Sequence, residues 1–107
     1  MMHDANYPWC LLIPEVNIIE YTDLTSKQYQ QLMQDSLQLQ QAMQTLFKPH
    51  KLNVAMLGNV ISQLHIHHIA RFNTDAAWPD PVWNTVPAKP YSASDLRKII
   101  DQLIAVL

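Results

Sequence analysis

The sequence is short of several features that define other classes of protein. Cys10 is the only cysteine in 107 residues, so no internal disulfide can form, and a reducing compartment such as the cytoplasm is expected. The longest apolar runs, such as residues 9–13, are far below the ~20 residues that span a bilayer. Met1 to Asp4 lack the basic region and apolar stretch of a signal peptide, so no membrane association is expected.

Positive charge and glycine are also scarce. The seven Lys and Arg residues are scattered and the net charge is −2, which excludes duplex nucleic acid as the main partner. A single nucleotide can be bound by a few well-placed hydrogen-bond donors, so this charge distribution is compatible with a nucleotide ligand. The only glycine, Gly58, follows a predicted strand, where glycine serves a positive φ, a close approach or an ordinary turn.

Apolar residues make up 49% of the chain and charged residues 15%, which is typical of a globular protein, and 107 residues correspond to one domain, residues 1–107. Apolar runs of strand length and two amphipathic segments predict an α+β fold. We expect a small antiparallel sheet backed by a long helix and a C-terminal helix. The predicted strands are residues 9–13, 51–57 and 64–72, and the predicted helices are residues 25–47 and a segment starting at Ser92.

Capping signals support both helices. Thr25 with Gln28 forms a possible capping box, Pro49 ends the long helix, and Ser92 with Asp95 begins the last one. Glutamines on the outer face of the long helix predict a solvated surface. The apolar stripe of the long helix is Tyr29, Leu32, Met33, Leu39, Met43, Leu46 and Phe47. Residues 15–24 are predicted to be a connecting loop, and the proline-rich residues 75–90 an ordered loop packed on the sheet.

Three of the five histidines lie in residues 63–71, QLHIHHIAR. Because side chains alternate along a strand, His65 and His67 share one face with Gln63 and Arg71, and His68 belongs to the other. His68 is predicted to be a structural or interface histidine. Arg71 fits either a surface residue at the strand end or a phosphate clamp.

The pair His65 and His67 has three interpretations. It could hold a metal, but the third ligand would have to be His3, His50, Cys10 or a distant carboxylate, and no ligand spacing supports this. It could catalyse, with one imidazole attacking phosphorus while its neighbours assist the leaving group. It could also be two exposed histidines without chemistry.

The segment GNVISQLHIH, residues 58–67, resembles the signature of the histidine triad superfamily, with Gln63 in place of the first histidine. The likeness extends to His3-Asp4, to residues 9–14, and to AAWPDPVW at residues 76–83, which is similar to a bacterial branch of the family whose triad also begins with glutamine. Relatives also carry an earlier helix and strand, so the chain is expected to be N-terminally short.

This resemblance implies a two-step reaction. His65 would attack the α-phosphorus of a nucleotide to form a nucleotidyl-histidine, which water hydrolyses, while the backbone carbonyl of Gln63 holds the other ring nitrogen. His67 and Asn59 would contact the phosphate beside Gly58. Asp4 would accept hydrogen bonds from the ribose.

The expected function is thus that of a nucleotide phosphohydrolase or nucleotidyl transferase without metal or cofactor. Purine nucleoside phosphoramidates, dinucleoside polyphosphates and adenylylated amines are the candidate substrates. The alternative is a nucleotide-binding or dimeric interaction protein with little turnover. Two departures from the family bear on this choice: Val60 occupies a position where many relatives have Ser or Thr, and Trp9 one that often holds an extra histidine. A homodimer is expected, because a short sheet would otherwise leave an open edge.

Overall fold

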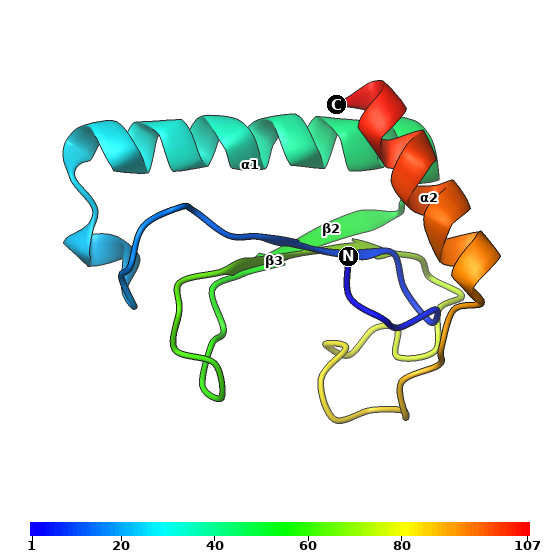
Figure 1. Ribbon diagram of the computed structural model, residues 1–107. Helices are drawn as coiled ribbons and strands as arrows, with labels where there is room; N and C mark the ends of the chain where they lie inside the picture. The colour runs from blue at the N-terminus through cyan, green and yellow to red at the C-terminus, as the bar shows by residue number, and fades with distance from the viewer.

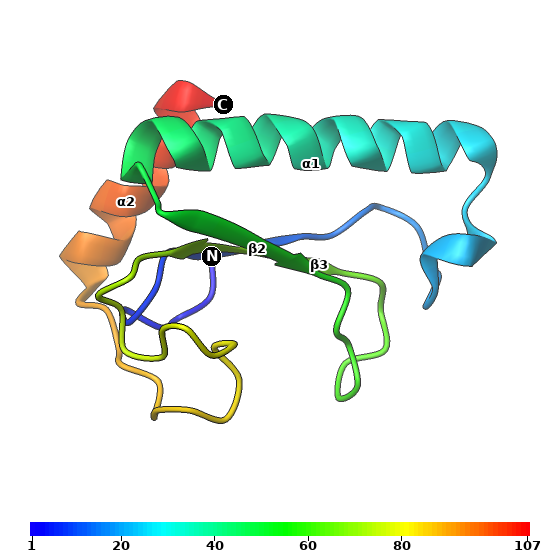
Figure 2. The same ribbon diagram turned by 180° about the vertical axis from the view of Figure 1, so that it is seen from behind.

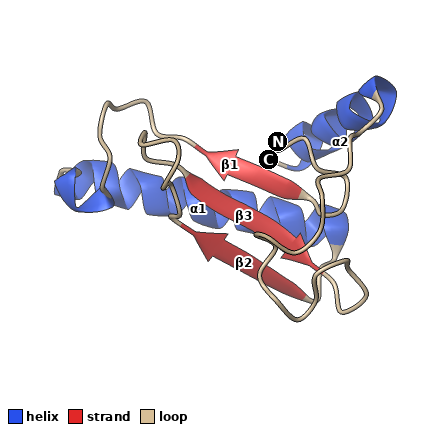
Figure 3. Ribbon diagram, turned by 90° about the horizontal axis from the view of Figure 1, so that it is seen from below, coloured by secondary structure: helices blue, strands red, loops and turns tan.

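The computed structural model describes residues 1–107 and confirms the α+β prediction. Its elements are β1 (Trp9–Leu12), the 3-10 helix η1 (Tyr21–Asp23), α1 (Ser26–Phe47), β2 (Lys51–Ala55), β3 (Ile66–Arg71) and α2 (Ala93–Val106). The sheet is antiparallel, with β3 between β1 and β2 (Figure 3). α1 lies across one face of the sheet and α2 crosses one end of α1 (Figure 1). Neither long helix has the length and apolar character needed to cross a membrane.

Local signals define the ends of both helices. The Thr25 hydroxyl accepts a hydrogen bond from the Gln28 backbone N–H at 3.2 Å, and the Gln28 side chain accepts one from the Thr25 N–H at 2.9 Å, which confirms the capping box. α1 ends where Lys48 turns to a φ of 49°, just before Pro49. The Ser92 hydroxyl accepts from the Asp95 N–H at 3.1 Å and begins α2.

All six residues of β3 are buried, because the central strand is covered on both faces. The face toward α1 packs into one core, and the opposite face packs against residues before β1 and the loop after β3. The first core contains Cys10, Leu39, Ala42, Met43, Ala70 and Leu103. The second contains Tyr7, Trp9, Ile69, Ala77 and Val82. The predicted alternation of β3 is therefore present, but neither of its faces is open to solvent.

All three predicted strands are longer than the observed ones, and β1 ends at Leu12, one residue before its predicted end. β3 begins at Ile66 instead of residue 64, because the backbone N–H of Leu64 donates to the Ile18 carbonyl at 2.9 Å in the loop before α1. β2 ends at Ala55 instead of residue 57, because the Leu57 carbonyl accepts from the His67 side chain. In both places a long-range bond replaces a ladder bond.

Arg71 has neither of its predicted roles, as it is only 1% exposed and is enclosed by protein. Its guanidinium forms two bonds to Asp75, at 2.8 and 3.1 Å, and two more to the Asn53 side chain and the Asp80 carbonyl, each at 2.8 Å. Burial alone would raise the pKa of Asp75, but bonds from Arg71 and from three backbone N–H groups outweigh burial and hold this pKa at about 2. This cluster fixes the loop after β3 against the sheet.

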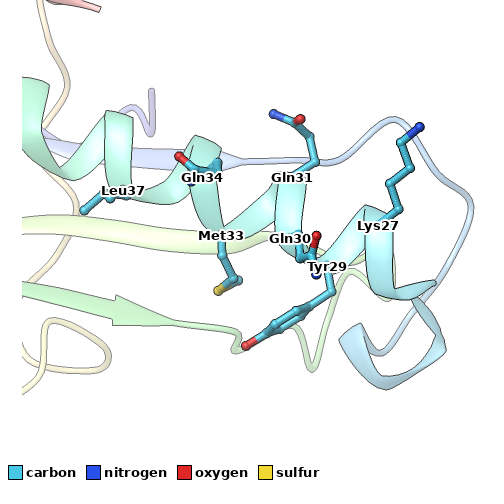
Figure 4. Close-up of a pocket in the computed structure, with 7 residues that line it drawn as sticks. All are labelled: Lys27, Tyr29, Gln30, Gln31, Met33, Gln34 and Leu37. Carbon is cyan, nitrogen blue, oxygen red and sulfur yellow. The ribbon is translucent and has the colours of Figure 1, made fainter.

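The predicted apolar stripe of α1 is only partly buried in the structure, so that prediction is partly wrong. Tyr29 is 43% exposed instead of buried, and with Leu37 it borders a groove of about 650 Å³ on the surface of α1. Figure 4 shows this groove, which is lined by Lys27, Tyr29, Gln30, Gln31, Met33, Gln34 and Leu37. The groove contains no histidine, so it is separate from the candidate chemistry.

Candidate active site

His65 lies just before β3, and a backbone carbonyl two residues earlier in the chain orients its ring. Its Nδ1 is 2.6 Å from the carbonyl oxygen of Gln63. Because a carbonyl only accepts, Nδ1 must carry the proton, and Nε2 of the neutral ring then has a free lone pair. The structure thus contains the Gln63 support that the sequence predicted, and it leaves Nε2 as a nucleophilic atom.

Gly58 lies against the ring of His65. A Cβ at this position would come within 2.9 Å of His65 Cε1 and 3.0 Å of the Ile61 carbonyl oxygen. The φ of Gly58 is not positive, so close approach, and not a left-handed turn, is the reason for glycine here. The connection between β2 and β3, which contains Gly58 and His65, lies on the face of the sheet away from α1 (Figure 2).

A small cavity of about 80 Å³ opens beside His65. Its lining residues are Ile19, Glu20, Met56, Gly58, Asn59, Ser62, Gln63, Leu64 and His65. The cavity brings together four predicted site residues, namely His65, Gln63, Asn59 and Gly58. No Lys or Arg is among the lining residues, and no group of three His, Cys, Asp or Glu side chains is placed to hold a metal ion.

Sequence reasoning missed Ile19 and Glu20, because residues 15–24 carry no motif and were predicted only as a connecting loop. Two long-range bonds hold this loop over the site. The Gln63 side-chain amide donates to the Val16 carbonyl at 2.7 Å, and the Leu64 N–H donates to the Ile18 carbonyl. Glu20 is exposed at the rim and is the only charged residue that lines the cavity.

His67 lies beside His65, with ring centroids 5.0 Å apart, but protein groups occupy both of its nitrogens. Nδ1 accepts from the indole N–H of Trp9 at 3.0 Å, so Nε2 carries the proton and donates to the Leu57 carbonyl at 2.8 Å. Trp83 packs edge-on against the ring at 5.1 Å. Burial lowers the pKa of His67, which exceeds the opposite effect of its bond to Leu57, and the nearby His65 lowers it further. The ring is therefore neutral at neutral pH.

His68 faces α1 and has no access to the cavity. It is fully buried, with Nδ1 donating to the Ile66 carbonyl at 3.1 Å and Nε2 2.7 Å from the Ser36 hydroxyl, which donates to it. Burial also lowers the pKa of His68. Its contacts are those of a structural histidine that ties α1 to the centre of the sheet.

Asp4 is buried and lies outside the residues that line the cavity. One carboxylate oxygen, Oδ1, accepts from the backbone and side chain of Asn6, at 3.0 and 2.9 Å, and from the Lys89 N–H at 3.2 Å. This joins the N-terminal turn to the segment that leads into α2. Oδ2 has no hydrogen bond within the chain.

Comparisons with known proteins agree on one family. The model of the HIT domain matches residues 1–74. A histidine triad protein from Bradyrhizobium japonicum is 41% identical, with a TM-score of 0.94 over 97% of this chain and 78% of that one. One from Marinobacter aquaeolei is 41% identical, with a TM-score of 0.95 over 100% and 79%. One from Sinorhizobium meliloti is 30% identical, with a TM-score of 0.96 over 100% and 80%.

No curated protein matches the chain. The family model nevertheless covers well over half of the chain, and it includes the Gln63, His65 and His67 segment. The solved structures share the fold along nearly its whole length. The chain belongs to the histidine triad (HIT) family.

Proposed function

We propose that the protein is a nucleotide phosphohydrolase or nucleotidyl transferase that acts at the α-phosphate through a nucleotidyl-histidine on His65. The observation that carries this proposal is the 2.6 Å bond from His65 Nδ1 to the Gln63 carbonyl, which leaves Nε2 unprotonated beside a small polar cavity. Family membership supports a function on nucleotides.

The neighbouring residues have supporting roles in this proposal. Asn59 lines the cavity and would donate to a phosphate oxygen. His67 would contact the same group only if its Nε2–H left the Leu57 carbonyl. The free Oδ2 of Asp4 would accept from the ribose hydroxyls. A cytoplasmic location and the absence of a cofactor complete the proposal.

The direct test is covalent labelling. The protein is incubated with α-phosphate-labelled purine nucleotide anhydrides, quenched, and searched for acid-labile label on His65. We expect label on the native protein and on His50→Ala, an exposed histidine outside the site, but none on His65→Ala. An unlabelled native protein with no turnover of any of these substrates would contradict the proposal.

The second candidate is a nucleotide-binding or dimeric interaction protein with little turnover. Two contacts favour this candidate. His65 is bonded to Gln63 and His67 to Trp9, and neither of these partners titrates, so neither can exchange protons during a reaction. In that case calorimetry would detect nucleotide binding to native protein and to His65→Ala alike, without label.

We also propose a homodimer. β1 and β2 are both edge strands, and large apolar side chains are exposed on β2, just after it, and on α1. These include Val54, Met56, Leu57, Tyr29 and Leu37. A dimeric mass at micromolar concentration is expected, and a monomeric mass with full secondary structure would contradict it.

A further inference from the structure

We propose that the site has no side chain able to donate a proton to the leaving group, and that its substrates are therefore nucleotide conjugates with weakly basic leaving groups. The leaving groups of this class are phenolates, carboxylates of acyl phosphates and phosphates of anhydrides. The proposal rests on nucleotidyl transfer at His65. The present proposal adds the class of bond that the site breaks in that transfer.

His67 is the first candidate for a general acid, and its contacts exclude it. Its only proton is on Nε2, so a neutral ring that gave it up would become an anion. A cationic ring would need a second proton on Nδ1, but Nδ1 faces the Trp9 N–H at 3.0 Å, and two donors would then oppose each other. Trp9 therefore acts as a positioning residue that keeps His67 in one neutral tautomer.

No other element around His67 supplies a charge that would reverse this state. β1 contributes Trp9, the segment after β2 contributes the Leu57 carbonyl, and the loop after β3 contributes Trp83. His65 is the one titratable side chain that faces the ring.

The remaining residues of the cavity are not acids in the required sense. Gln63 holds an amide that does not titrate, and its N–H donates to the Val16 carbonyl. Asn59 and Ser62 are neutral at all relevant pH values. The side chain of Glu20 is exposed and has no hydrogen bond within the chain, and a carboxylate accepts hydrogen bonds and does not donate them.

The reaction is balanced without a protein acid. The lone pair of His65 Nε2 forms the bond to phosphorus, and the bond to the leaving group breaks with its electron pair, so the leaving group departs as an anion. The Nδ1 proton stays on His65 and bonds to the Gln63 carbonyl throughout. Water then attacks phosphorus, the electron pair of the P–N bond returns to Nε2, and the water proton passes to solvent.

A graded series of leaving groups tests the proposal. Adenosine 5′-monophosphate aryl esters, from p-nitrophenol to unsubstituted phenol, have similar size but rising leaving-group basicity. A general acid is worth about 10²–10⁴-fold, so without one we expect labelling of His65 to slow by at least about 10²-fold across the series. A difference below about threefold would overturn the proposal. Absence of label with every ester would instead contradict nucleotidyl transfer itself.

Two further measurements separate the alternatives. If the dependence is shallow and becomes steep in Glu20→Gln, then Glu20 is the acid and the proposal is wrong. Nitrogen NMR of His67 reads the tautomer without any substrate. We expect a neutral ring with its proton on Nε2 at pH 7 in the native protein, and in Trp9→Phe, which keeps an aromatic ring but removes the N–H, protonation at higher pH than in the native protein. An imidazolium at pH 6.5 in the native protein would overturn the proposal.

Discussion

Gly58 lies so close to His65 that a single added methyl group would meet the ring, at 2.9 Å from Cε1. Gly58→Ala is therefore expected to displace the nucleophile and slow labelling of His65 by at least about tenfold, because small misplacements of reacting groups are costly. Since the φ of this residue is not positive, the free energy of unfolding should change by less than about 1 kcal/mol. Urea unfolding and the labelling rate, measured on the same samples, separate the two effects.

Ile61→Ala is the matched control for that variant, because Ile61 is exposed and belongs to the same loop. Its labelling rate should equal that of the native protein. Equal rates in Gly58→Ala and Ile61→Ala would show that the close approach has no part in the chemistry.

Ser36 carries a contact that is needed for stability and not for chemistry. Ser36→Ala leaves Nε2 of the buried His68 without a donor, which is expected to lower the free energy of unfolding by about 1–3 kcal/mol. The labelling rate below the melting temperature should be unchanged. Thr45→Ala serves as control, since it removes an exposed hydroxyl from the same helix. A loss of labelling without a loss of stability would argue against this assignment.

Asp75 makes stability sensitive to strong acid. Its pKa in the folded protein is about 2, below the ordinary 3.8. Its contribution to the free energy of unfolding is therefore complete above pH 3.8 and is lost as the pH falls toward 2. The shift corresponds to about 2 kcal/mol. Asp75→Asn should remove this acid dependence and, by leaving Arg71 buried without a counter-charge, lower stability by about 3–5 kcal/mol at neutral pH. Urea titrations at pH 4.5 and 2.5 measure both effects, and Asp101→Asn, at an exposed ion pair, is the control.

The buried histidines predict a second pH dependence, in a milder range. His67 and His68 have pKa values below the ordinary 6.5, so the unfolded chain binds more protons than the folded one in weak acid. Stability is therefore complete above pH 6.5 and falls as the pH drops below it. Urea unfolding at pH 7.5 and 5.5 should show this loss, and His68→Gln should reduce it. Equal stability at both pH values would contradict the neutral state of the two rings.

Features that depend on neighbouring residues could be predicted from the sequence. The Thr25 and Gln28 capping box is a local signal, and the alternation of a strand correctly separates His67 from His68. The support of His65 by the Gln63 carbonyl also spans only two residues. These signals were enough to predict the fold class and the hydrogen bond between His65 and the Gln63 carbonyl.

Features that depend on distant residues could not be predicted. The Trp9 bond to His67 joins residues 58 positions apart, and nothing in either neighbourhood marks the pair. The loop that carries Glu20 reaches the cavity through bonds to Gln63 and Leu64, and no periodicity or motif reports them. Arg71 is far more buried than its charge suggests, because Asp75 follows it at a spacing that the strand pattern does not reveal.

The walls of the cavity come from three separate stretches of the chain, near residues 19, 57 and 64, and the long helix α1 lies between the first and second of them in sequence. We do not expect a fragment that lacks α1 to assemble the cavity. Labelling of His65 is therefore also a report on complete folding, and during refolding it should recover with the slowest structural phase and not with the formation of helix.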